Sequence, residues 1–306
     1  MLRTSLAVLL SLASLVLVVP ASAQSTGEYS LTSSSRFTLD LGFYYGEGPD
    51  LIGQRHGRAL LVPSLAINAD VFAISDDVSL SIDVQFRSVA SFGRWVLEDR
   101  TDFRAGNLHG GVRVAVRPMR ELRVRGGFGV VGPLMNVYDA GSLIPPVAAD
   151  FAIIQVPLSA LPNGAWDPWM VSRGYVPLVF RVDAEYRQDW LFFGGEAALG
   201  VGVPVLEGYE GVAIGAQLGL WGGVRPIPEL AAGLRVQTVM YDEGRSSGDP
   251  SAVGFFTLVP FVRGELNDVF LESRFFVNVV DNTAYDTIGE KAWGLYLLIG
   301  SDFDVR

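Results

Sequence analysis

Charged side chains of both signs recur at every second position in several stretches of this 306-residue chain. One group, Arg113, Arg117, Arg123 and Arg125, is basic and lies on both sides of a single turn, and a second group, 181–187, carries charges of both signs. Rows of arginine lining a pore attract permeant anions, whereas opposite charges paired across strands stiffen a wall. The spacing therefore supports either an anion-attracting constriction or a salt-bridge lattice that fills a lumen. The nine candidates for lumen and selectivity positions are Arg113, Arg117, Arg123, Arg125, Arg181, Asp183, Glu185, Arg187 and Arg235.

The residues give little support for catalysis, metal binding or phosphate binding. Neither His56 nor His109 has a serine two positions later, so a His-x-Ser hydrolytic dyad is absent, and the chain has no cysteine for thiolate or iron–sulfur chemistry. The acidic residues show no calcium-loop spacing. The glycines of 200–205 fall within a predicted strand, which favours a steric role over a phosphate cradle. We predict no enzyme activity, no catalytic residue, no cofactor and no metal site.

The elements that would position these charges are strands. Apolar and polar residues alternate strictly over 36–45, over 80–87 and over 178–187, for example Leu178, Phe180 and Val182 against Arg181 and Asp183. Period-two alternation of this length predicts β-strands. Nine further strands are expected near 59–72, 107–117, 121–131, 190–203, 212–224, 229–240, 253–265, 269–280 and 293–304.

Short turns and longer connections alternate between these strands. The short turns are Asp76-Asp77, 118–121, Gln188-Asp189, 226–229 and Asn267-Asp268. The longer connections are 46–57, 90–105, 132–174, 204–211, 240–252 and 281–292. Short turns on one side and longer loops on the other, with an even strand count, are typical of a transmembrane antiparallel barrel. A soluble β-sandwich is the alternative, but it has no reason to make every second connection short.

The first residues indicate export. Arg3, the apolar run from Leu6 to Val19 and the Ala21-Ser22-Ala23 ending match a secretory signal peptide, so we expect residues 1–23 to be cleaved. Residues 24–35 would then form a short periplasmic segment and 36–306 the barrel. A net charge of −10 argues against nucleic acid as a partner.

Over the whole mature length the chain resembles the porin-like outer-membrane β-barrels of Gram-negative bacteria, in its export signal, alternation and loop asymmetry. The resemblance implies an all-β, up-and-down barrel of about twelve strands with periplasmic turns and extracellular loops. It also implies outer-membrane lipid, lipopolysaccharide and small solutes or ions as partners.

The segment 132–174 is too long for a simple connector, and its apolar content argues against disorder. We expect it either to fold into the mouth as a constriction, with Trp166, Asp167 and Trp169 as candidates, or to form an extracellular lobe. The function expected is passive passage of small solutes through a narrow, charge-lined lumen. The alternative is a non-conducting structural or surface-binding protein that acts through its loops.

Overall fold

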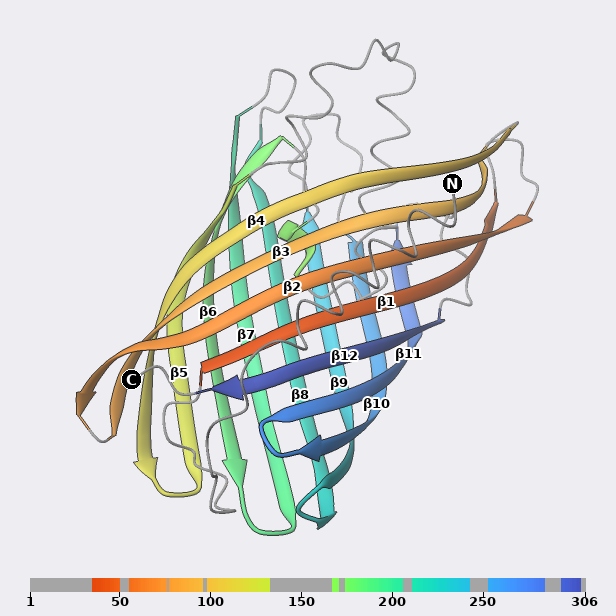
Figure 1. Cartoon of the computed structure of the whole chain (residues 1–306). Coiled ribbons are helices and arrows are strands. Elements are labelled where there is room, and N and C mark those ends of the chain that lie inside the picture. The colour runs from red at the N-terminus through yellow and green to blue at the C-terminus, as the bar shows by residue number, and fades with distance from the viewer. Residues whose placement is uncertain are drawn as a thin grey trace. The chain divides into compact units, whose positions relative to one another are not determined.

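Twelve antiparallel strands close into one barrel in the computed structural model of the protein (Figure 1). The structure describes residues 35–49, 55–75, 77–95, 98–132, 167–170, 174–205, 211–242, 253–283 and 293–303. Each strand pairs with its neighbours in sequence, and β1 pairs with β12 to close the ring. The predicted fold class is confirmed. The predicted signal peptide, 1–23, lies outside the described residues.

The strands agree with the predicted stretches in number and position. Their bounds are β1 Ser35–Pro49, β2 Arg55–Ser75, β3 Val78–Trp95, β4 Glu98–Met119, β5 Leu122–Gly132, β6 Tyr175–Arg187, β7 Leu191–Pro204, β8 Ala213–Ile227, β9 Leu230–Asp242, β10 Val253–Leu266, β11 Val269–Thr283 and β12 Trp293–Phe303. One 3-10 turn, η2 (Pro168–Met170), interrupts the connection between β5 and β6. Among the described residues, no helix is long and apolar enough to cross a membrane.

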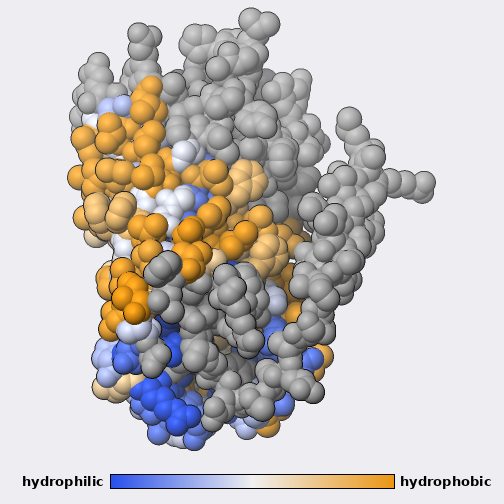
Figure 2. All heavy atoms as spheres, turned by 60° about the vertical axis from the view of Figure 1, so that its left-hand side comes forward, coloured by the Kyte–Doolittle hydropathy of each residue, from blue (hydrophilic) through white to orange (hydrophobic). Residues whose placement is uncertain are grey.

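The alternation predicted from the sequence separates two faces. On β6, Phe180 and Val182 are about half exposed on the outside, whereas Asp183 between Val182 and Ala184 is buried inside. On β12, Trp293, Leu295 and Leu297 face outward and Tyr296 faces inward. Figure 2 shows the result on one side of the barrel: apolar residues cover its middle and upper part, and hydrophilic residues gather at its lower end. An exposed apolar band of this kind is the lipid-facing surface of a transmembrane barrel.

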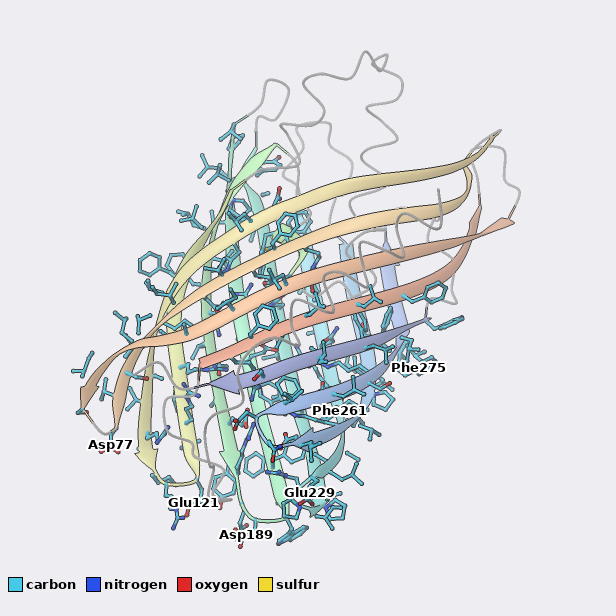
Figure 3. The ribbon with its side chains drawn as sticks, in the orientation of Figure 1. Asp77, Glu121, Asp189, Glu229, Phe261 and Phe275 are labelled. Atoms are coloured by element: carbon cyan, nitrogen blue, oxygen red, sulfur yellow. The ribbon has the colours of Figure 1, made fainter. Side chains whose placement is uncertain are left out.

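The five predicted short turns all lie at one end of the barrel. Figure 3 shows Asp77, Glu121, Asp189 and Glu229 together at that end. The fifth turn places Asn267 in the left-handed region at φ 55°, a conformation that asparagine tolerates better than most residues.

Two predicted connections are wrong. The sequence predicts a loop over 46–57, but β1 and β2 stay paired as far as Pro49 and Arg55. It also predicts a loop over 90–105, but β3 and β4 continue pairing from Phe86 to Trp95 on one strand and from Glu98 to Leu108 on the other. Only residues 96–97 join them. The apolar alternation that predicts strands reports a lipid-facing surface, whereas strand pairing needs only backbone hydrogen bonds. A hairpin can therefore extend beyond the stretch where alternation marks it.

Candidate functional site

The inner wall of the barrel carries a lattice of ion pairs. Arg113 of β4 forms one ion pair with Asp83 of β3 and a second with Asp183 of β6, the latter at 3.3 Å. Arg125 of β5 donates to the other oxygen of Asp183 at 2.7 Å. One buried carboxylate thus joins arginines from two different strands. Further pairs among the described residues of the wall include Arg187–Glu185, Arg225–Glu265, Arg235–Glu196, Arg263–Glu265, Arg263–Glu272 and Arg274–Glu272.

The structure separates the predicted basic group. Arg113 and Arg125 converge on Asp183, and Arg123 lies opposite Glu185 in the β5–β6 register. Arg117 lies near the turn, where its backbone N–H donates to the Asp77 carbonyl at 2.9 Å. The arginines therefore surround carboxylates and do not form a cluster of one sign.

A short segment of the long β5–β6 connection lies inside the lumen. We call Asp167 and η2 together the inserted segment. The Arg181 guanidinium donates to Asp167 Oδ1 at 2.7 Å, and Gln217 of β8 exchanges two hydrogen bonds with Asp167, at 2.9 and 3.1 Å. The Asn107 side chain of β4 donates to the Trp169 carbonyl at 3.1 Å. Three strands therefore hold the backbone and the acidic side chain of this segment.

Trp169 anchors the inserted segment by packing. It is 1% exposed and belongs to a buried cluster with Val131, Met170, Val179 and Ala198. Its ring lies against two directly paired glycines, Gly200 of β7 and Gly215 of β8. A Cβ added at Gly200 would approach Trp169 Cε3 to 2.7 Å, and one at Gly215 would approach it to 3.4 Å. The glycine pair leaves a recess in the wall that the indole fills.

Charge also stabilises the inserted segment. Burial acts to raise the pKa of the Asp167 carboxyl, but the Arg181 and Arg87 guanidiniums and the Gln217 hydrogen bond outweigh it and lower that pKa below its ordinary value. Asp167 therefore stays ionised at neutral pH. Its backbone is left-handed, with φ 55°, which turns the chain into η2.

A cavity of about 140 Å³ lies beside the inserted segment. Asp167 forms part of its lining, and the other lining residues come from β1–β3 and β9–β12. The inserted segment thus contacts one half of the barrel wall, while the cavity follows the other half. The charged lining residues besides Asp167 are Arg87, Arg235 and Arg274, and the aromatic ones are Phe276 and Tyr296.

Sequence reasoning found part of this arrangement. Asp167 and Trp169 were candidates for a constriction, with an extracellular lobe as the alternative for 132–174; both lie against the inner wall, and their role as a constriction stays a prediction. The third candidate, Trp166, lies outside the described residues. Gln217, Asn107 and the two glycines were missed. Gln217 is the single polar residue in a largely apolar predicted strand, which was the only signal available for it. In the part of the chain that the structure describes, no cluster of His, Asp or Glu could hold a metal ion.

Comparison with known proteins supports the fold. No family model and no curated protein matches the sequence. Among solved structures, an outer membrane channel from Pseudomonas putida F1 superposes with a TM-score of 0.61 at 9% identity, covering 92% of this chain and 100% of that one. The NanC porin gives a TM-score of 0.47 at 8% identity, covering 87% of this chain and 100% of that one. The β domain of the Bordetella autotransporter BrkA gives 0.46 at 10% identity, covering 89% and 100%. The chain has the fold of an outer-membrane β-barrel.

Proposed function

We propose that the protein is a restrictive outer-membrane channel that allows passive diffusion of small solutes. The observation that carries the proposal is the inserted segment, which lies inside the lumen against β4–β8 and has a cavity beside it along the other strands. A barrel with an apolar exterior and a charged, partly occupied interior suits slow, size-limited passage.

The strand number supports a narrow pore. Barrels of eight strands have interiors filled by side chains, whereas barrels of sixteen to eighteen strands leave an open aqueous channel. Twelve strands fall between these cases. The ion-pair lattice narrows the lumen further, because guanidinium and carboxylate groups project from the wall on both sides of Asp183.

The proposal also covers how the protein reaches the outer membrane and how it is oriented there. Residues 1–23 would direct export and be removed, and outer-membrane lipid and lipopolysaccharide would surround the apolar band. The short turns, with Asp77 and Glu121 among them, would face the periplasm, because bacterial barrels place short turns there and longer loops outside.

One observation favours the alternative of a non-conducting structural or surface-binding barrel. Trp169 and Met170 are almost completely buried, so the inserted segment is fixed by packing as well as by polar contacts. A permanent plug would have this property too.

Single-channel recording in planar bilayers separates the two functions. The full mature barrel, shown to be folded by its heat-modifiable gel migration, should give small, discrete conductance steps. A variant with residues 133–173 replaced by a short Gly/Ser linker should give larger steps, since the inserted segment is removed. A folded barrel that conducts in neither form would overturn the channel proposal and support the alternative.

A further inference from the structure

The cavity beside the inserted segment is lined by cationic and by apolar side chains. Arg87, Arg235 and Arg274 contribute positive charge from β3, β9 and β11. Phe276, Tyr296 and Leu298 contribute an apolar surface from the neighbouring strands β11 and β12. Arg274 is paired directly with Tyr296 across β11 and β12 and lies two residues from Phe276 on the same face, so a guanidinium and two rings lie side by side in this lining.

Among the arginines that line this cavity, Arg274 presents its guanidinium, because its carboxylate partner lies deeper in the wall. The Arg274 side chain is 34% exposed, while its partner Glu272 is 7% exposed. Arg235 differs, since its side chain is 17% exposed and that of its partner Glu196 is 23% exposed. Positive charge is therefore offered to a solute mainly at Arg274. Guanidinium also matches the planar geometry of a carboxylate, which it binds through two parallel hydrogen bonds.

The one carboxylate in the lining does not cancel this preference. Asp167 already accepts hydrogen bonds from Arg181 and Gln217. Its charge is thus directed toward the wall that holds the inserted segment.

The volume limits the size of the ligand. The cavity measures about 140 Å³. An engineered apolar cavity of about 150 Å³ holds one benzene molecule. A body of about ring size therefore fits this cavity.

We propose that this cavity is a binding site for small organic carboxylates with an apolar body of about the size of a benzene ring. The carboxylate contacts Arg274, and the body lies against the neighbouring rings of Phe276 and Tyr296. The inference rests on the proposed channel function for transport, but the site itself requires only the closed barrel.

The experiment uses benzoate as the probe on the full mature barrel in planar bilayers. In a potassium chloride gradient the reversal potential should show anion preference. Benzoate should block the chloride current at concentrations where acetate, which lacks the ring, and benzyl alcohol, which lacks the charge, do not. Arg274→Gln should weaken the benzoate block about fivefold, the loss expected for a charge-assisted hydrogen bond in a water-accessible site.

A matched variant tests the position of the charge. Arg225→Gln also removes an arginine that is ion-paired, to Glu265 at 3.2 Å, but Arg225 does not line the cavity. It should leave the benzoate block unchanged. Arg274→Lys should restore part of the block, since it keeps the charge and loses the planar fork.

The outcomes separate the two proposals. A conducting barrel with cation preference, or one that benzoate does not block, overturns the carboxylate site and leaves the channel standing. If the barrel does not conduct, quenching of tryptophan fluorescence by benzoate in the detergent-folded protein tests the site directly. Quenching that Arg274→Gln weakens supports a binding site in a non-conducting barrel, and its absence overturns the site as well.

Discussion

The glycine pair beneath Trp169 makes the inserted segment sensitive to a single methyl group. Gly200→Ala adds a Cβ that would lie 2.7 Å from Cε3 and 3.1 Å from Cζ3 of the indole, far inside van der Waals contact. The ring is 1% exposed and enclosed by Val131, Met170 and Val179, so it has no space to move sideways. We expect the substitution to displace the inserted segment from the wall.

The free-energy cost of Gly200→Ala follows from this overlap. Adding a methyl group to a well-packed site costs about 1–3 kcal/mol. Because about 1.4 kcal/mol changes an equilibrium tenfold, the population with the segment released should rise roughly five- to 150-fold. Gly215→Ala should have a smaller effect, since its Cβ would lie 3.4 Å from the indole and 3.0 Å from Tyr241.

Single-channel recording measures the released population as the fraction of time spent in a larger conductance state. Gly110→Ala is the control, because Gly110 lies on the outer face of β4 and a Cβ there has no neighbour within 4 Å. The expected order of opening is Gly200→Ala above Gly215→Ala, with Gly110→Ala equal to the original protein. Equal opening in Gly200→Ala and Gly110→Ala would refute the view that the glycine recess holds the segment.

Three further predictions concern charge and lipid exposure. Because the pKa of Asp167 is lowered, its stabilisation of the inserted segment is complete at neutral pH and is lost as the pH falls through that lowered value. The large conductance state should therefore appear on acidification well below the usual carboxyl range. Asp167→Asn should show this state at neutral pH, with little further dependence on pH. Asp183→Asn deprives Arg113 and Arg125 of a shared carboxylate and should lower the free energy of unfolding by about 1–3 kcal/mol, measured by urea unfolding in lipid vesicles, with unchanged stability as the contrary result. Val182→Arg in the lipid-facing band should cost about 2–4 kcal/mol in the same assay, whereas Leu266→Arg beside the Asn267-Asp268 turn should cost about 1 kcal/mol or less; similar costs for both would contradict the assignment of the lipid band.

The fold could be predicted because the lipid environment requires a regular alternation of apolar and polar residues along the strands. Every residue that faces hydrocarbon must be apolar, so Leu178, Phe180 and Val182 mark β6 without any knowledge of the rest of the barrel. The alternation is expected only in the parts of the strands that face lipid. Residues 88–106 lack it, and the sequence therefore missed the extension of the β3–β4 hairpin.

The lumen was less predictable because its contacts are between residues far apart in the chain. Asp167 meets Gln217, 50 positions away, and the Trp169 carbonyl meets Asn107, 62 positions away. Alternation shows that Gln217 faces inward but cannot show what lies opposite. Tyr296 and Phe276 face inward as well, although a strict apolar-out, polar-in pattern would place aromatic residues outside.

The contacts that hold the inserted segment come from one continuous stretch of the barrel. Asn107 lies on β4, Val131 on β5, Arg181 on β6, Gly200 on β7 and Gln217 on β8. These strands follow one another in the chain, and the segment itself leaves from β5 and returns to β6. These polar and packing contacts are complete once five neighbouring strands have paired, before β1 meets β12, and the charge of Arg87 on β3 adds to them. Assembly of the barrel can therefore place the segment first and close the ring around it afterwards.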